Sequence, residues 1–320
     1  MPEDKNIPLL VIGAGSIGER HIHVLQNLGY NNIFVYRQRN LPLRTISQKS
    51  VKTFTNWDMI KEITPVAAFI CTPSSYHITQ AIDCANLGIH LLVEKPLSSE
   101  LSNFKMLRET VEKHNVNLQV GYMLRYHPLM QQLKGFIQSN LFGNLLSYQS
   151  YWGEYLPNWH PWENYRNSYA AQKNLGGGVA LTLSHDIHLI LWLSESKLID
   201  YSIIKNYRAN LEIDVESGAD ISMKFENGIT GHCHLNYFEK ATKRYYRLVF
   251  DEASVEINYD KNEMIITEDG MARIVKAEGF ERNQMFEEQC KYFISKINNF
   301  SIEDSLKQIE ESEQIIKICA

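Results

Sequence analysis

Residues 7–18, IPLLVIGAGSIG, decide the fold of the first part of the chain. The apolar run 7–12 predicts a buried strand, and residues 17–28 carry apolar side chains at helical spacing. Between them lies G-x-G-x-x-G, which indicates dinucleotide binding where it joins a strand to a helix. The first glycine permits the turn, the second admits a pyrophosphate, and the third lets helix and strand pack closely, while the helix N-terminus faces the phosphates. The predicted cofactor contacts here are Gly13, Gly15, Ser16, Ile17 and Gly18.

Strands and helices go on alternating up to Gly121. Further strands are predicted over 32–36, 51–54, 66–71, 89–93 and 117–121, and helical patterns over 75–87 and 98–113. Strands separated by helices pair in parallel through right-handed crossovers. The sequence therefore predicts an α/β Rossmann domain with a doubly wound parallel sheet over residues 1–121.

After residue 121 the pattern changes to runs of strands. The clearest, 218–225, alternates apolar and polar side chains and ends at the turn Asn227-Gly228. Other strands are predicted over 229–235, 245–250, 255–259 and 264–267, and two closing helices around 286–297 and 302–309. We expect an α+β domain over 122–320 with an open, mainly antiparallel sheet. If helices cover one face and the other is exposed and apolar, that face would bind a second copy and give a homodimer or homotetramer.

Composition agrees with two domains and excludes several classes of partner. The chain has 320 residues, of which 44% are hydrophobic and 22% charged. A chain of this length exceeds what a single hydrophobic core usually serves. A net charge of -5 without a basic stripe argues against nucleic acid. There is no 18-residue apolar run and no signal-peptide pattern, so we expect no membrane partner and a cytoplasmic location. The five cysteines form no C-x-x-C, so neither a metal site nor a disulfide framework is indicated.

Glu94-Lys95-Pro96 directly follows the predicted strand 89–93. Ligands of open parallel sheets bind just past the carboxyl ends of the strands, so Lys95 is a candidate catalytic residue. An isolated Lys-Pro pair is more often a surface lysine before a loop. The glycine motif upstream is what favours the catalytic interpretation.

Residues 148–169 are rich in tyrosine and tryptophan, with proline, histidine, glutamate and arginine between them. Aromatic faces beside a few polar groups suit a sugar, whose ring offers both CH patches and hydroxyls. The alternative is a surface loop whose rings serve only as packing. The candidate substrate contacts in this segment are Trp152, Trp159, Tyr165 and Arg166.

A second candidate segment begins with three glycines at 176–178 and goes on as a helical pattern over 179–193. The glycines would let a ligand approach the backbone. Thr182, His185 and His188 are three apart and would be neighbours on the helix surface. A histidine there can exchange a proton near neutral pH, although a histidine on a helix is more often structural.

Cofactor choice depends on the end of the strand 32–36. An acidic residue there normally binds the ribose hydroxyls of NAD, but this chain has Arg37 and Arg39. The arginines favour a 2′-phosphate, and so NADP over NAD.

Five segments, taken together and in order, carry a family resemblance. They are GAGSIGERH (13–21), CTPSSYH (71–77), EKPL (94–97), GYMLRYHP (121–128) and GGGVALTLSHDIH (176–188). The chain resembles the glucose-fructose oxidoreductase and inositol dehydrogenase (Gfo/Idh/MocA) family. The resemblance implies a nicotinamide-dependent oxidoreductase acting on the CH–OH group of a sugar, cyclitol or sugar nucleotide.

The resemblance also implies roles for particular residues. Lys95 would hydrogen-bond the reacting hydroxyl or carbonyl beside the cofactor, and His185 would donate or accept its proton. The Lys95-Pro96 bond is similar to one often found cis in relatives. Further implied cofactor contacts are Thr72, Pro73, His77 and Glu94, and Arg125 is an implied substrate contact.

The chain departs from the family at Thr182 and His188, where many relatives carry aspartates. Threonine can hydrogen-bond but cannot take a proton at neutral pH. Either Lys95 and His185 suffice, or His188 has taken over part of the work, or the substrate differs. Two other interpretations therefore stay open: a reductase of a non-sugar carbonyl or imine, and a non-catalytic NAD(P)-binding sensor or accessory protein.

Overall fold

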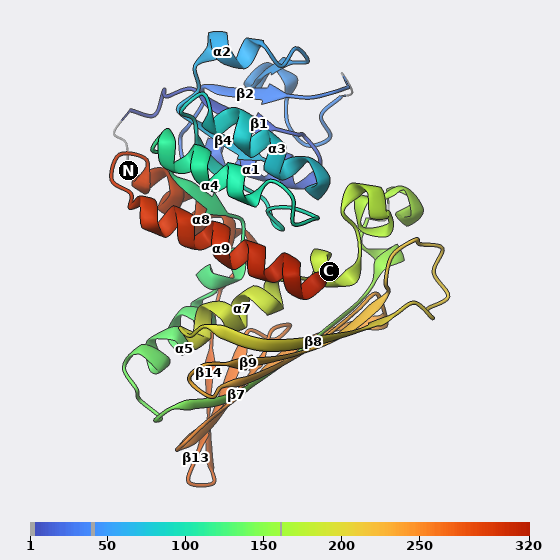
Figure 1. Cartoon of the computed structure of the whole chain (residues 1–320), viewed down its shortest axis with the longest axis vertical. Coiled ribbons are helices and arrows are strands. Elements are labelled where there is room, and N and C mark those ends of the chain that lie inside the picture. The colour runs from blue at the N-terminus through green and yellow to red at the C-terminus, as the bar shows by residue number, and fades with distance from the viewer. Residues whose placement is uncertain (1–3, 40–41, 161) are drawn as a thin grey trace. The chain divides into compact units, whose positions relative to one another are not determined.

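The structure is a computed structural model that describes residues 4–39, 42–160 and 162–320 (Figure 1). The chain divides into two compact units, Met1–Met123 with Arg282–Glu313 and Leu124–Glu281 with Gln314–Ala320. The domain limits expected from the sequence, 1–121 and 122–320, stay a prediction. The units differ from them in one respect, because the segment Arg282–Glu313 returns to the first unit instead of closing the second.

The first unit contains a parallel sheet of the doubly wound type. Its strands lie in the order β3-β2-β1-β4-β5-β6 and every neighbouring pair is parallel. The strands are β1 (Leu9–Ile12), β2 (Ile33–Tyr36), β3 (Lys52–Phe54), β4 (Ala67–Ile70), β5 (His90–Val93) and β6 (Leu118–Val120). All residues of β1 and β4 are buried, as their continuous apolar runs require. The predicted Rossmann sheet is confirmed.

Helices connect these strands and cover the sheet. They are α1 (Ser16–Asn27), α2 (Met59–Ile63), α3 (Ser74–Ala85) and α4 (Phe104–Lys113), with a 3-10 turn η1 (Gln48–Ser50) and, from the end of the chain, α8 (Arg282–Lys296) and α9 (Ile302–Cys319). Helix α8 packs against α1. Helix α4 begins later than residue 98, where the sequence predicted it, because Asn103 adopts a left-handed φ of 67° that a helix cannot include.

The second unit contains an eight-stranded sheet in the order β14-β13-β12-β11-β7-β10-β9-β8. The strands are β7 (Leu145–Tyr155), β8 (Leu198–Asn206), β9 (Gly218–Phe225), β10 (Thr230–Asn236), β11 (Phe238–Phe250), β12 (Ala253–Asn258), β13 (Glu263–Glu268) and β14 (Met271–Lys276). Only the β7–β10 pair is parallel among these strands, so the sheet is mainly antiparallel, as predicted. Three strands, β7, β8 and β14, were not predicted.

The alternative of a surface loop over 148–169 does not hold for the first part of this segment, which lies in the central strand β7. This strand pairs with β11 on one side and with β10 on the other. Tyrosine and tryptophan favour strands because they pack well on a half-buried sheet, and this preference outweighs the polar residues between them.

Short helices complete the second unit. They are α5 (Pro128–Gln138), α6 (Val179–Thr182) and α7 (His185–Ser194), with the 3-10 turns η2 (Met123–Tyr126), η3 (Leu156–Asn158), η4 (Tyr165–Asn167), η5 (Tyr169–Ala171) and η6 (Lys173–Leu175). Helix α7 packs on β7 and β10, and α6 on β9 and β10, so both cover one face of the sheet. The single helix predicted over 179–193 is interrupted, because α6 ends at Thr182 and α7 begins at His185, with Ser184 at its N-cap position. Thr182 and His185 therefore belong to different helices.

Within the described ranges no helix is long and apolar enough to cross a bilayer. The same ranges contain no group of three or more histidine, cysteine or acidic side chains that could hold a metal ion. All five cysteines are free and buried.

Candidate active site

The three motif glycines have three different surroundings. Gly13 has a φ of +93°, and a Cβ on it would lie 2.9 Å from the Cys71 carbonyl oxygen. A Cβ on Gly18 would lie 2.0 Å from the Gly13 oxygen, so helix α1 could not pack here with any larger residue. A Cβ on Gly15 would meet no atom within 4 Å. The first and third glycines thus serve the chain, whereas the second faces open space, as a bound pyrophosphate requires.

The motifs of the first unit meet along one edge of its sheet. Beyond the strand ends the backbone hydrogen bonds go on from strand to strand, joining Arg37 N to Phe54 O (3.0 Å), Gly13 N to Tyr36 O (3.0 Å), Cys71 N to Ile12 O (2.8 Å), Glu94 N to Ile70 O (2.9 Å) and Gly121 N to Val93 O (2.7 Å). The glycine loop, the Thr72-Pro73 segment and Glu94-Lys95-Pro96 therefore lie side by side at the carboxyl ends of β1, β4 and β5. This is the switch point of strand order, where such sheets bind their ligands.

Lys95 is half-buried, and Glu94 before it points away from solvent. One Glu94 oxygen is 2.7 Å from Nε2 of His21 on α1, and the other accepts a hydrogen bond from the Lys95 amide at 3.3 Å. Burial acts to raise the pKa of Glu94, but His21 and the charge of Lys95 together lower it, so the carboxylate is ionised. Sequence reasoning missed His21, although its position three residues after Gly18 puts it on the packed face of α1. Glu94 thus anchors the Lys95 backbone, and its contact with a cofactor stays a prediction.

The Lys95-Pro96 bond is cis, as the resemblance implied. His77 on α3 lies with Nδ1 2.8 Å from the Pro96 oxygen and Nε2 2.7 Å from the Thr72 oxygen. The Thr72 hydroxyl donates to Gln80 at 2.7 Å. Both ring nitrogens of His77 thus contact backbone carbonyl oxygens. The predicted contact of this ring with a cofactor stays a prediction.

Arg37 and Arg39 differ in their surroundings. Arg37 is buried and lines a hollow of about 140 Å³ together with Thr53, Phe54 and Thr55, whereas Arg39 is exposed. A third arginine, Arg44, which the sequence did not single out, donates to the Ser16 hydroxyl at 2.9 Å. The first unit therefore brings two arginines, Arg37 and Arg44, to the end of β2 and the glycine loop.

In the second unit His185 is the first residue of α7 and is almost fully buried. Its ring stacks on Trp152 of β7 with the ring centroids 6.0 Å apart. The Arg244 guanidinium lies 3.4 Å from the centroid of the Trp152 ring and donates to the buried Asp186 carboxylate at 3.3 Å. Burial raises the pKa of Asp186, and the Arg244 charge partly offsets this rise. The ring of Trp152 is thus covered by His185 and Arg244, which favours a packing role for it.

Two further predicted residues of the second unit, Thr182 and His188, are also buried. His188 has a pKa well below its usual value, because burial and the nearby positive charge of Arg125 disfavour the imidazolium. Thr182 lies beside the Tyr237 hydroxyl, and the Trp159 ring meets the Tyr237 ring edge-on at 5.4 Å. The second unit therefore brings His188 near Arg125, and Thr182 and Trp159 near Tyr237.

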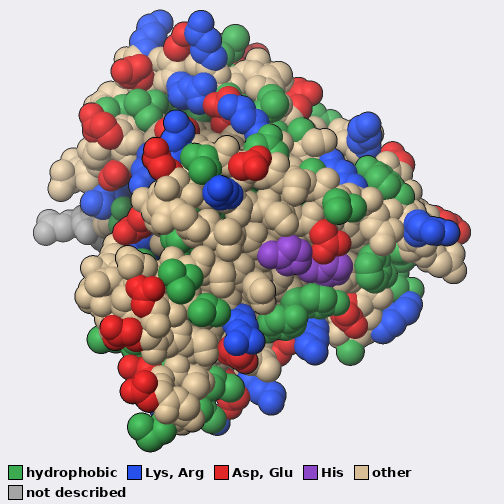
Figure 2. All heavy atoms as spheres, turned by 60° about the horizontal axis from the view of Figure 1, so that its bottom comes forward, with side chains coloured by type: hydrophobic (Ala, Val, Ile, Leu, Met, Phe, Trp, Pro, Cys, Tyr) green, Lys and Arg blue, Asp and Glu red, His purple; other side chains and the backbone are tan. Residues whose placement is uncertain are grey.

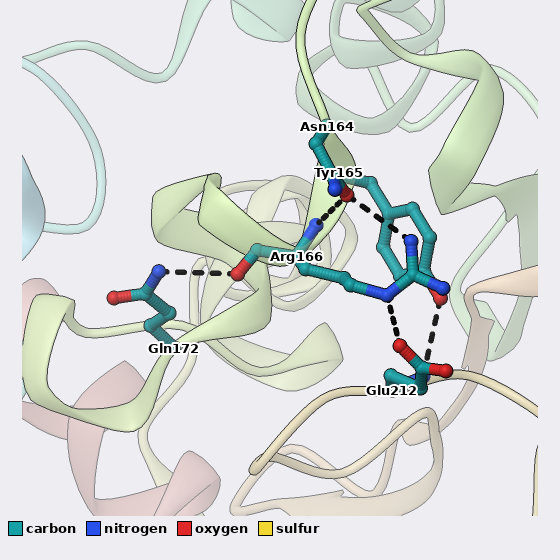
Figure 3. Close-up of polar contacts among 5 residues, drawn as sticks. All are labelled: Asn164, Tyr165, Arg166, Gln172 and Glu212. Atoms are coloured by element: carbon teal, nitrogen blue, oxygen red, sulfur yellow. Dashed lines mark hydrogen bonds and ion pairs between the residues drawn. The ribbon is translucent and has the colours of Figure 1, made fainter.

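Tyr165 and Arg166 lie at the surface of the second unit (Figure 3). The Arg166 guanidinium stacks on the Tyr165 ring at 4.8 Å and forms an ion pair with Glu212. The Tyr165 hydroxyl accepts a hydrogen bond from the Glu212 amide at 3.2 Å. These contacts fix the aromatic segment to residue 212, and a substrate contact of Tyr165 or Arg166 stays a prediction.

Two of the glycines at 176–178, Gly177 and Gly178, are required by the packing of the chain itself. A Cβ on Gly177 would lie 2.5 Å from the Tyr169 oxygen, and one on Gly178 would lie 2.5 Å from the Glu216 carboxylate. The expectation that a ligand approaches the backbone at these two glycines was wrong, because protein atoms already fill the space.

Known proteins resemble this chain over both units. The family model described as "Oxidoreductase family, NAD-binding Rossmann fold" matches residues 7–122, and the one described as "GFO/IDH/MocA C-terminal domain" matches residues 130–258. The rhizopine catabolism protein MocA of Rhizobium meliloti is 26% identical over 60% of this chain and 59% of its own length. Glucose-6-phosphate 3-dehydrogenase of Bacillus subtilis is 24% identical over 66% of this chain, and the chain again spans 59% of that relative. A solved structure of levoglucosan dehydrogenase in complex with NADH has a TM-score of 0.82 at 17% identity, covering 98% of this chain and 96% of its own.

Proposed function

Because the chain belongs to the Gfo/Idh/MocA oxidoreductase family, we propose that it transfers a hydride between a nicotinamide cofactor and a carbinol or ketone carbon of a sugar, cyclitol or sugar nucleotide. The observation that carries the proposal is that the glycine loop and the Lys95 segment lie at the same edge of the first sheet. The space beside Gly15 in that loop is open. A pyrophosphate at the glycine loop directs the rest of a dinucleotide along this edge. The printed names of the relatives support a sugar-like substrate.

The first unit is an NAD-binding domain, and we propose NADP as its preferred cofactor. Arg37 stands where an acidic residue would select NAD, and its burial leaves the guanidinium little access to bulk water. A buried guanidinium is stabilised by an anion, and the 2′-phosphate of NADP would supply one. Arg39 and Arg44 would add positive charge near the same phosphate.

The chemistry of hydride transfer belongs to the bound nicotinamide. The protein would position the reacting hydroxyl and move its proton. His185 would accept this proton in the oxidation direction, and Lys95 would stabilise the negative charge that develops on oxygen. His188 is neutral at physiological pH because of its lowered pKa, so it can hydrogen-bond a sugar hydroxyl without adding charge. Thr182 and Arg125 would complete the polar contacts, with Trp159, Tyr165 and Arg166 as predicted substrate residues.

We further propose that the sheet of the second unit pairs with a second copy of the chain. The face turned away from α7 carries the row Tyr245, Tyr151 and His234, in which neighbouring rings stack at 5.4 and 4.9 Å. Figure 2 shows histidine side chains next to hydrophobic ones, among charges of both signs. Exposed apolar side chains on the strands of this unit are Leu146, Ile199, Tyr201, Ile204, Tyr245, Met271 and Ile274. Their number supports a homodimer or homotetramer.

Turnover of a substrate panel tests the proposed function. The purified chain is incubated with free sugars, cyclitols and sugar nucleotides in the presence of NAD or NADP, and the nicotinamide absorbance is followed. We expect at least one sugar-like compound to reduce the cofactor. Imines or non-sugar carbonyls that oxidise the reduced cofactor, with no response to sugars, would favour the other reductase, and tight cofactor binding without turnover would favour the sensor.

A further inference from the structure

His77 makes two contacts that a neutral histidine cannot make together. Its Nδ1 lies 2.8 Å from the Pro96 oxygen, and its Nε2 lies 2.7 Å from the Thr72 oxygen. A carbonyl oxygen only accepts hydrogen bonds, and a neutral imidazole has one N–H and one lone pair. In either neutral tautomer one nitrogen lone pair would face an oxygen lone pair. Only the imidazolium, which carries two N–H groups, satisfies both carbonyls.

The ring has no access to water that could relieve a poor contact, since the residue is 1% exposed. Burial is the largest influence on the pKa of His77 and lowers it, while the two carbonyls and the Glu94 carboxylate act to raise it and Lys95 to lower it. The net direction is downward, so the ring loses its second proton more readily than a free histidine does. The two short contacts therefore describe the protonated form, and the neutral form must give up one of them.

The two carbonyls belong to the segments that carry the candidate chemistry. Pro96 follows Lys95 directly, and Thr72 follows the end of β4. On the other side of Lys95, the Glu94 carboxylate is held by His21 and accepts from the Lys95 amide. The charged and titratable groups around this cluster are Arg20 and His21 on α1, Cys71 after β4, Glu94 and Lys95 after β5, and His77 on α3. Two buried histidines from different helices thus fix the backbone on both sides of Lys95.

We propose that His77 is a positioning residue for Lys95 whose hold depends on one proton. With two ring protons it ties the Pro96 carbonyl to the Thr72 carbonyl and fixes the Lys95 segment to the end of β4. With its single proton on Nε2 it keeps the Thr72 contact and releases the Pro96 carbonyl, and the Lys95 segment gains freedom. This inference rests on the proposed role of Lys95 in the reaction. The proposed function itself does not require His77 to change its protonation state.

Two conservative substitutions separate the two contacts. The amide nitrogen of asparagine lies near the position of imidazole Nδ1, and that of glutamine near Nε2. His77→Asn therefore keeps the Pro96 contact, and His77→Gln keeps the Thr72 contact. Because a displacement of about 1 Å can reduce turnover about 100-fold, we expect His77→Gln to lower kcat at least about tenfold more than His77→Asn does. The pH profile of kcat in the wild type should contain a fall towards high pH that His77→Asn lacks, since an amide does not titrate.

Two spectroscopic measurements need no substrate. Reductive methylation with 13C-formaldehyde gives each lysine a signal, and Lys95→Arg identifies that of Lys95. His77→Gln should shift this signal and His77→Asn should leave it in place. The 15N spectrum of the His77 ring should show one protonated nitrogen at about pH 8 and a second one as the pH falls below the lowered pKa of the ring.

These measurements can overturn the proposed positioning role of His77. Equal kcat losses in the two variants, an unshifted Lys95 signal in His77→Gln, or one unprotonated ring nitrogen at every pH would overturn the proposal. If no sugar is turned over but the Lys95 and ring signals behave as expected, the positioning role stands and the proposed function fails.

Discussion

Replacing Arg244 by methionine should destabilise the second unit strongly. Arg244 and Asp186 form a buried ion pair in which both side chains are at most 4% exposed, and the Trp152 ring lies against the guanidinium. Arg244→Met removes the cation and leaves the Asp186 carboxylate in the core without its charge partner. Breaking one side of a buried pair costs about 3–5 kcal/mol in the free energy of unfolding. The same strand offers a matched control, since Arg247 pairs with Glu256 at 3.7 Å with both side chains about half exposed (51% and 52%). Arg247→Met should cost less than about 1 kcal/mol.

Urea unfolding followed by tryptophan fluorescence reports the stability of the second unit in both variants. Four of the five tryptophans belong to this unit, namely Trp152, Trp159, Trp162 and Trp192. The double variant Asp186→Asn/Arg244→Met should recover most of the loss, since it leaves no uncompensated charge. Burial already raises the pKa of Asp186, and without Arg244 this pKa rises further above its value in the unfolded chain. The protonated carboxyl then favours the folded state, so the deficit of Arg244→Met should be smaller at about pH 5 than at about pH 8. An Arg244→Met variant no less stable than Arg247→Met, or a deficit that does not change with pH, would refute the reasoning.

Three further predictions concern the cofactor and the chemistry. Gly15→Ala should leave the melting temperature unchanged but weaken NADPH binding in a fluorescence titration, because the added Cβ enters the space left for a pyrophosphate. Gly18→Ala should instead lower the melting temperature, because its Cβ would clash with the Gly13 oxygen. Lys95→Met and His185→Ala should each lower kcat about 100- to 10,000-fold with the true substrate, and normal turnover in both would show the assignment to be wrong. Arg37→Gln should weaken NADPH about 10- to 100-fold with little change for NADH, as expected for one charge-assisted contact, and calorimetry showing tighter NADH than NADPH binding in the wild type would contradict it.

Local sequence was sufficient where the backbone itself demands a residue type. The turn at Gly13, the open space at Gly15 and the helix contact at Gly18 were all indicated by a motif that joins a strand to a helix. The strand β9 was predicted with its bounds, because its side chains alternate between core and solvent.

Contacts between distant residues could not be predicted in this way. His21 and Glu94 are 73 positions apart and meet only after α1 packs on the sheet. Arg244 and Asp186 are 58 positions apart, and neither stood out, because a single charged residue within a strand or helix looks like part of a solvated face. Strand β7 was missed because its place depends on β10 and β11, which follow much later in the chain.

The discontinuous first unit has a consequence for the order in which the protein can mature on the ribosome. Helix α8 emerges only after every strand has been synthesised, yet its Phe293 packs against Phe69 of β4, and its Cys290 lies 3.5 Å from Nδ1 of His21. Until then, the face of α1 that carries His21 has no cover, and the anchor of Glu94 is open to water. A nascent chain that stops before residue 282 therefore lacks Gln314–Ala320 of the second unit and leaves the Lys95 segment of the first unit unfinished. A truncated product therefore lacks part of the framework that the candidate chemistry needs.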